Sequence, residues 1–395
     1  MGSLHHTAKR NSIPEGWRNL KLGSVFSLSS GNSKPENTIS ILTDENIIPV
    51  YGGNGVLGYT DKCQDVGEQL VIGRVGINCG NIYYINGPYW ITDNALYARE
   101  WKTEVIIKYI CYHLSYLDLG KLKSKTGQPL VSQKPIYDLP ISLPPICEQK
   151  KVSQILSAWD RAIERVQRLI EARQRQKKGL MQVLLTGRLR FPEFGEPVYG
   201  EENIPCGWKA IEFHDCATRS KKKIDPVTNG FNFRCVELEH ISQETGKIIG
   251  ETESKQQTSS KNYFRPGNVL FGKLRPYLNK FAFCDFEGVC SSEIWVLQNK
   301  SICTSRYLFY LVQTDTFLSA SSQTTGTKMP RSDWNVVKKT KFALPNLEEQ
   351  ERITALLDQV EQNIELLERY VMQLKQQKKG LMQKLLTGEI RVKVE

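Results

Sequence analysis

The sequence predicts an α/β fold: two globular mixed α/β domains separated by two long helices. Three observations predict it: a duplicated segment, an apolar heptad pattern in each copy, and short stretches of alternating apolar and polar residues elsewhere. We expect the two helices to pair as an antiparallel coiled coil, which would give the chain a pseudo-twofold internal repeat.

The duplication is read directly from two segments near the ends of the two halves. Residues 177–187 read KKGLMQVLLTG and residues 378–388 read KKGLMQKLLTG, so ten of eleven positions match at an offset of 201. The order of globular unit and helical segment therefore occurs twice, as duplication produces. Further landmarks recur at similar offsets: LPPICEQKKVSQIL (143–156) with LPNLEEQERITALL (344–357), IPEGW (13–17) with IPCGW (204–208), and Gly73-Arg74 with Gly272-Lys273.

These landmarks set the expected domain boundaries. We expect a first globular domain at 14–145, a first helical segment at 146–188, a linker at 189–203, a second globular domain at 204–346 and a second helical segment at 347–390. Within the globular domains, alternating stretches such as QLVIGRVG and NVLFGKLRPYLNKFAF predict strands. The apolar segments 105–117 and 305–320 predict one helix in each domain.

Each helical segment carries a heptad seam. Apolar residues follow steps of four and three from Val152 to Ile170, and the second copy repeats them from Ile353. At 1.5 Å per residue, about five heptads give a helix of roughly 50 Å. Because the first segment is basic and the second is nearly neutral, we expect opposite charges across the seam: Glu361, Glu365 and Glu368 facing Arg161, Arg165 and Arg168. The other interpretation is two separate amphipathic helices, each packed on its own domain.

The charge balance favours a polyanionic partner. Lys and Arg number 53 against 42 Asp and Glu, a net charge of +11, although a soluble protein can also be basic without such a partner. No stretch of about 18 apolar residues predicts a membrane span, and the first residues lack the apolar core of a signal peptide. The ten cysteines form no C-x-x-C pair, so we expect free thiols in the cytoplasm.

Motifs for catalysis, cofactors and metals are missing from the sequence. There is no P-loop and no H-E-x-x-H, and LPPI (143–146) lacks the polar and aromatic members of a base-flipping methyltransferase loop. The spacing of Cys206, His214 and Cys216 fits no zinc ribbon or finger. We therefore expect no catalytic residue, no bound cofactor and no metal in this chain.

Basic and amide side chains gather instead in loops of both globular domains. Lys and Arg supply affinity through phosphates, whereas Arg, Asn and Gln also read base edges. The alternative for any one position is a solvated lysine. The candidate DNA-binding residues are Asn54, Arg74, Lys123, Lys125, Gln128, Lys221, Lys222, Lys223, Lys273, Arg275, Lys280, Lys328 and Arg331.

The stretch VYGGNGVLGYT contains the spacing G-x-G-x-x-G at Gly53, Gly55 and Gly58. A dinucleotide-binding enzyme would use this spacing, but its third glycine must open a helix. Gly58 runs instead into a segment without a helical apolar period, so the stretch predicts a strand and a turn. We expect the turn to bring Asn54 and backbone amides near DNA. The second half lacks this stretch, so the two globular domains differ at this point.

The chain resembles the specificity subunits of type I restriction-modification enzymes over essentially its whole length. The duplicated lead into a heptad helix and the duplicated KKGLMQ-LLTG carry the resemblance, together with VYGGNGVLGY and GNVLFGKLRPYLNK. It implies that each globular domain is a target-recognition domain for one half of a split site in double-stranded DNA. It also implies that the paired helices form a spacer of fixed length. The alternative is a stand-alone coiled-coil DNA-binding protein.

The resemblance further implies partners and the absence of catalysis. Two modification subunits would dock on the helices, carry S-adenosylmethionine and methylate adenine, and restriction subunits would complete the nuclease. The specificity subunit itself would then be a non-catalytic member of the complex. Because the two domains of this chain differ in sequence, its target should be an asymmetric bipartite site.

Overall fold

The computed structural model describes residues 14–124, 128–199, 204–226, 228, 230–325 and 329–394. They divide into two units. The first unit comprises the chain up to Gln167 together with the part from Arg369 onward, and the second comprises Arg168–Glu368. Helices α3 (Ile146–Leu184) and α8 (Leu347–Leu386) therefore contribute a segment to each unit. Among the described residues, no helix is both long enough and apolar enough to cross a membrane.

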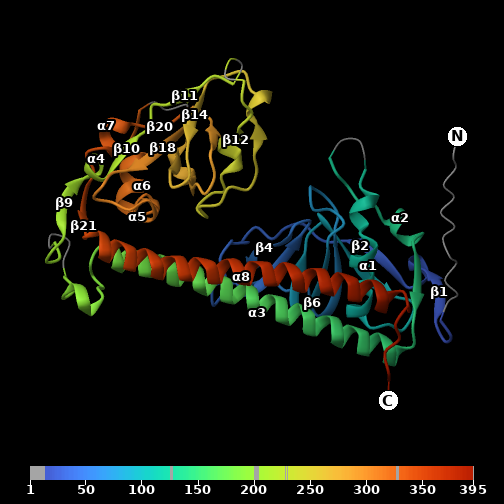
Figure 1. The fold of residues 1–395 in the computed structure, drawn as a ribbon. Helices are drawn as coiled ribbons and strands as arrows, with labels where there is room; N and C mark the ends of the chain where they lie inside the picture. Colours follow the sequence, from blue (N-terminus) through green and yellow to red (C-terminus); the bar gives the residue numbers. More distant parts are fainter. Residues whose placement is uncertain are drawn as a thin grey trace. The chain divides into compact units, whose positions relative to one another are not determined.

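The first unit is built around a six-stranded sheet in the order β2-β7-β5-β6-β3-β4. Helix α1 packs on this sheet, and its buried Tyr109, Ile110 and Leu114 join the core with Leu70 and Ile72 of β5 (Figure 1). A small sheet of β1 and β8 leads into α3. The elements before α3 are β1 (Arg18–Lys21), β2 (Phe26–Ser30), β3 (Ile48–Gly52), β4 (Gly55–Thr60), β5 (Asp65–Gly73), β6 (Ile82–Ile91), β7 (Ala95–Trp101), α1 (Ile107–Leu117), α2 (Gln133–Tyr137) and β8 (Pro140–Leu143).

The second unit contains two larger sheets, ordered β10-β18-β15-β16 and β11-β14-β17-β12-β13. The pairs β9–β21 and β19–β20 are separate. Its elements before α8 are β9 (Lys209–Glu212), α4 (Phe213–Cys216), β10 (Ala217–Arg219), β11 (Lys223–Ile224), β12 (Arg234–Val236), β13 (Thr252–Glu253), β14 (Lys261–Phe264), β15 (Val269–Gly272), β16 (Phe281–Phe283), β17 (Gly288–Cys290), β18 (Ile294–Asn299), α5 (Ser305–Leu311), α6 (Asp315–Ser322), β19 (Thr324–Thr325), β20 (Arg331–Ser332), α7 (Trp334–Val337) and β21 (Lys341–Leu344). Short 3₁₀ turns in the two units cover Leu22–Ser24, Leu119–Leu122, Pro192–Phe194, Leu238–His240, Ser254–Gln256 and Pro276–Leu278.

The expected mixed α/β domains are confirmed, with one helix predicted wrongly. The segment 305–320 forms two helices, α5 and α6, rather than one. The break occurs because the Thr314 side chain accepts a hydrogen bond from the Phe317 amide and so begins a new helix. The expected helix at 105–117 is present as α1.

The two long helices run antiparallel within each unit. In the first unit Asp160 of α3 bonds Lys378 of α8 at 2.5 Å, and Glu148 pairs with Arg391 beyond the end of α8. In the second unit Lys177 pairs with Glu361. The expectation that Glu361 faces Arg161 is wrong. The spacing along α3 from Asp160 to Lys177 equals the spacing along α8 from Lys378 back to Glu361. Both ion pairs therefore have the same antiparallel register.

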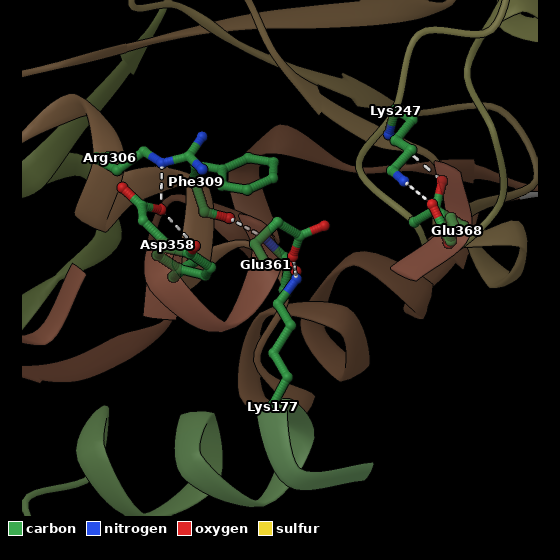
Figure 2. Close-up of polar contacts among 10 residues, drawn as sticks. Lys177, Lys247, Arg306, Phe309, Asp358, Glu361 and Glu368 are labelled. Atoms are coloured by element: carbon green, nitrogen blue, oxygen red, sulfur yellow. Dashed lines mark hydrogen bonds and ion pairs between the residues drawn. The ribbon is translucent and has the colours of Figure 1, made fainter. Parts of the chain in front are cut away.

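Side chains of α8 hold the second globular domain to the helices inside the second unit (Figure 2). Asp358 accepts hydrogen bonds from Arg306 Nε at 2.6 Å and from the Tyr310 hydroxyl at 2.5 Å. Nearly three turns further along α8, Glu368 accepts from Lys247 at 2.5 Å. These contacts connect α5 and a loop of the domain to the same helix.

In each unit, an arginine just past the end of one long helix forms an ion pair with a glutamate near the start of the other. Arg190, just past the end of α3, binds both carboxylate oxygens of Glu349 at 2.9 Å, and both side chains are only 2% exposed. Trp208 Nε1 donates to the same carboxylate at 2.9 Å. In the first unit Arg391 binds Glu148 and donates to the Glu15 carbonyl at 2.9 Å. Both partners of the first ion pair are thus buried, whereas in the second Arg391 is 43% exposed and Glu148 only 4% exposed.

Candidate nucleic-acid interface

The loop after β5 in the first unit is fixed by backbone hydrogen bonds. The Arg74 amide donates to the Asn94 carbonyl at 3.0 Å, and the Arg74 carbonyl accepts from the Val131 amide at 2.9 Å. The neighbouring Gly76 amide donates to the Pro129 carbonyl at 3.0 Å. These bonds join three segments that are distant in sequence, so the backbone of the loop is held in one place.

The loop after β15 in the second unit has the same bonds. The Lys273 amide donates to the Glu293 carbonyl, and the Lys273 carbonyl accepts from the Ser332 amide, each at 2.9 Å. The Arg275 amide donates to the Pro330 carbonyl at 2.8 Å. The sequence aligns Gly73-Arg74 with Gly272-Lys273, and the structure gives these residues equivalent hydrogen bonds. Each unit therefore has its own loop after β5 or β15, and the two loops have the same backbone hydrogen bonds. We call this arrangement the loop framework.

The candidate residues of the first unit surround this framework. Asn54 is exposed in the turn between β3 and β4, and its Oδ1 lies 3.9 Å from where a Cβ of Gly76 would be. Arg74 Nη1 donates to Ser30 Oγ at 2.8 Å, and Lys123 Nζ donates to the Ile77 carbonyl at 2.7 Å. Gln128 is exposed nearby in sequence, whereas Lys125 lies outside the described residues.

The glycines of VYGGNGVLGYT form a hairpin turn pressed against this framework. A Cβ on Gly53 would lie 2.3 Å from the Val75 carbonyl oxygen, and one on Gly73 would lie 2.4 Å from the Gly53 oxygen. Only glycine allows backbone to approach backbone this closely. Gly58 lies inside β4 and not at the start of a helix. The dinucleotide-binding alternative is therefore wrong, because it requires a helix there.

A Gly53→Ala variant should lower the free energy of unfolding by about 1–3 kcal/mol, because the new methyl group must displace the Val75 carbonyl. The matched control is Gly380→Ala in the first-unit part of α8, where a Cβ would meet nothing within 4 Å. It should raise that free energy by about 0.5–1 kcal/mol, since alanine favours helix. Urea denaturation measures both changes, and equal effects of the two substitutions would refute the close approach at Gly53.

The candidate residues of the second unit form two groups. Lys221 and Lys222 are exposed between β10 and β11, and Lys223 is exposed as the first residue of β11. Lys222 Nζ lies 4.1 Å from the centre of the Tyr263 ring. The other group follows β15. Arg275 is exposed, and Lys280 Nζ donates to the Leu238 carbonyl at 2.8 Å. Lys328 lies outside the described residues.

Glu293 is an acidic residue at this interface that sequence reasoning did not find. It accepts hydrogen bonds from Arg331 Nε at 3.0 Å and from Arg331 Nη2 at 3.3 Å. Lys273 Nζ lies 4.0 Å from the same carboxylate. Hydrogen bonding to Glu293 raises the pKa of Arg331, so this guanidinium stays charged. Glu293 thus orients two of the predicted basic side chains.

Two cavities adjoin at this interface, with volumes of about 220 and 420 Å³. Both are lined by Arg219, Lys273 and Trp295. Trp334 also lines the larger one, and its ring stands edge-on to Trp295 with centroids 5.4 Å apart. Arg219 begins the basic stretch that continues to Lys223, whereas sequence reasoning missed both tryptophans. No local sequence pattern identifies these tryptophans, because Trp295 lies in β18 and Trp334 in α7, and only the fold brings them together.

Ligands for a metal are not brought together in the described part of the chain. Its residues contain no group of three or more His, Cys, Asp or Glu side chains that could hold an ion. Cys206 is exposed and Cys216 is buried, and all ten cysteines are free. The loops instead carry basic and aromatic side chains on a hydrogen-bonded backbone, and such side chains are typical of nucleic-acid-binding sites.

Fold and interface together define a class: a duplicated α/β protein that presents one loop framework from each half and connects the halves by long helices. Comparison with known proteins agrees. The family model described as the type I restriction modification DNA specificity domain matches this chain twice, at residues 14–174 and 220–376. The chain therefore belongs to the family of type I restriction-modification DNA specificity subunits.

Individual relatives span nearly the whole chain. The type I restriction enzyme MjaVIII specificity subunit of Methanocaldococcus jannaschii is 26% identical, covering 96% of this chain and 94% of its own. The EcoDI specificity subunit of Escherichia coli is 23% identical, covering 88% and 82%. The crystal structure of the type I restriction-modification S subunit from M. genitalium has the same fold, with a TM-score of 0.56 at 14% identity and coverage of 96% and 98%.

Proposed function

We propose that this specificity subunit directs a type I restriction-modification complex to a bipartite DNA target, with one recognition domain for each half-site. We assign these domains to residues 14–145 and 204–346. The observation that carries the proposal is the shared loop framework, in which Arg74 and Lys273 have the same backbone hydrogen bonds but different surroundings. Two recognition domains with the same loop backbone but different side chains would bind DNA in the same way and recognise different base sequences.

The two half-sites should differ in sequence. The first framework carries the glycine turn with Asn54 and Arg74, whereas the second carries Glu293 and a cavity with two tryptophans. Amide and guanidinium groups that read base edges are therefore placed differently in the two domains. We infer an asymmetric target, in which the candidate residues of each domain contact one half-site.

The long helices would serve as the spacer and as the docking platform. Helices of 39 and 40 residues that run antiparallel in each unit support a continuous coiled coil and a pseudo-twofold repeat. We propose that two modification subunits dock on them and that restriction subunits complete the assembly. S-adenosylmethionine would bind to the modification subunits, and this chain would contribute recognition without catalysis.

The experiment that tests this function is a map of methylated adenines. The subunit is co-expressed with its modification subunit in a host lacking other adenine methyltransferases, and genomic N6-methyladenine is sequenced. We expect a single motif made of two unlike half-sites separated by a fixed gap of unspecified bases. A stand-alone DNA-binding protein would leave the genome unmethylated, and a continuous palindrome as the only motif would contradict one domain per half-site.

A further inference from the structure

Two residues that line the larger of the two adjoining cavities in the second unit each have a buried polar atom without a partner. Trp295 is 3% exposed and Ser332 is 7% exposed, and both line this cavity. Among the described residues, neither Trp295 Nε1 nor Ser332 Oγ has a hydrogen-bond partner. A buried donor without an acceptor is costly, so native structures seldom retain one without a reason.

The lining of the two cavities is strongly basic. Its acidic member is Asp333, whose side chain is already engaged with the Asn335 amide at 2.8 Å at the start of α7. Arg219 Cζ lies 5.7 Å from the centre of the Trp334 ring, which orients the guanidinium. The elements that carry these residues, β10, β18, β20 and α7, lie together in the second unit (Figure 1). The basic residues of the lining are Arg219, Lys221, Lys223, Lys273 and Arg331.

The first unit has aliphatic side chains at the matching positions. Arg219 pairs with Leu297 across β10 and β18, as Leu28 pairs with Ala98 across β2 and β7. Trp295 aligns with Leu96 at the offset that aligns Lys273 with Arg74. Leu28 and Leu96 are 6% and 1% exposed and belong to the core. The basic and aromatic cavity is therefore a feature of the second recognition domain.

The hydrogen-bonding groups of the lining indicate which kind of ligand the cavity would bind. Arginine, lysine and the indole N–H donate hydrogen bonds and accept none. The edge of a base pair combines donors and acceptors, whereas a phosphodiester offers acceptors only and carries a negative charge. Although Glu293 already pairs with Arg331 and Lys273, the donors and positive charge of the remaining basic residues match a phosphate better than a base.

We propose that this cavity binds one phosphodiester of the DNA backbone in the second half-site, with Arg219 and Trp295 as the phosphate ligands. The inference rests on the proposed DNA-recognition function. The contact would fix the position of the second domain on its half-site and would carry no sequence information itself. The first domain, with leucines at these positions, would be positioned by other contacts.

The test uses the complex with modification subunits and a duplex carrying the methylated motif. Arg219→Gln keeps a polar but shorter side chain and removes the charge, and Trp295→Phe keeps a ring while removing the N–H. Each should weaken binding, Arg219→Gln by roughly tenfold or more, as is typical for a charged hydrogen bond. Arg219→Gln should also reduce the slope of log affinity against log salt by about 0.9. Lys255→Leu, an exposed lysine outside both cavities, is the control for net charge, and its slope should stay near the wild-type value.

A scan of single methylphosphonate substitutions locates the contact. One neutral linkage in the second half-site should weaken the wild-type complex and should have no further effect on the Arg219→Gln complex. If every linkage weakens both complexes equally, the proposal is wrong. A changed base at one motif position in Arg219→Gln would instead indicate base reading and would also overturn it.

Free phosphate is the other source of the same chemistry. Inorganic phosphate added at constant ionic strength should not compete with DNA at this site, and selective competition in the wild type but not in Arg219→Gln would overturn the proposal. Failure of the proposed function would look different, because the wild-type subunit would then direct no methylated motif at all. Loss of the phosphate contact leaves that motif unchanged in sequence.

Discussion

An Arg190→Met variant is expected to lose about 3–5 kcal/mol of unfolding free energy, because it leaves the carboxylate of Glu349 buried without its counter-ion. Arg190 binds both oxygens of Glu349 and also donates to the Cys206 carbonyl at 3.1 Å. One side chain therefore joins the end of α3, the start of α8 and the entry to the second domain. Urea denaturation followed by tryptophan fluorescence measures the loss, and Trp208 lies in the same contact.

Arg391→Met is the matched control, since Arg391 occupies the equivalent place in the duplicated sequence. Arg391 is 43% exposed whereas its partner Glu148 is only 4% exposed, so the loss should lie between that of a buried and that of a surface ion pair and be smaller than in Arg190→Met. Hydrogen exchange should show weakened protection at the start of α8 in Arg190→Met and at the start of α3 in Arg391→Met. Equal losses of stability in the two variants would show that burial does not determine the strength of these ion pairs.

Lengthening both long helices by one heptad should lengthen the unspecified gap of the DNA target. Seven residues add about 10 Å of helix, which corresponds to about three base pairs at 3.4 Å each. A whole heptad keeps the apolar seam in phase. The insertions belong after Gln167 and after Glu368, where the two units meet along the sequence, so that contacts inside each unit are kept. The methylated motif of the variant measures the new gap.

The control inserts seven Gly and Ser residues between Phe194 and β9, which lengthens the chain and leaves α3 and α8 intact. Its motif should keep the original gap. If the heptad variant also keeps that gap, with methylation intact, the helices do not set the spacing of the half-sites. Changed half-site sequences in the heptad variant would likewise contradict the separation of recognition from spacing.

Local patterns in the sequence predicted the regular elements well. The glycine stretch was expected to form strand and turn, and β3 and β4 confirm it. The helix at 105–117 follows from its apolar period and appears as α1. The break between α5 and α6 was missed because one threonine hydroxyl outweighed the apolar pattern. A single cap of about 1 kcal/mol can decide such a boundary.

Pairings between distant residues could not be predicted in the same way. Facing Glu361 with Arg161 placed nearly equivalent positions of the two copies side by side, whereas an antiparallel pair brings Lys177 to Glu361. The cavity of the second domain combines Arg219, Trp295 and Trp334 from three elements, and only the fold brings them together. The roles of the candidate DNA-binding residues remain predictions, and Lys125 and Lys328 lie outside the described residues.

The central claim is that each recognition domain reads one half-site, and replacing the second domain with a copy of the first tests it most directly. Residues 204–346 are exchanged for a second copy of 14–145. The junctions match, because Arg391 binds the Glu15 carbonyl as Arg190 binds the Cys206 carbonyl. The adenine methylation map of this variant should show an interrupted palindrome made of the first half-site twice, with the gap of the parent motif. If the variant methylates the parent's asymmetric motif, residues 204–346 do not determine the second half-site and the account is wrong.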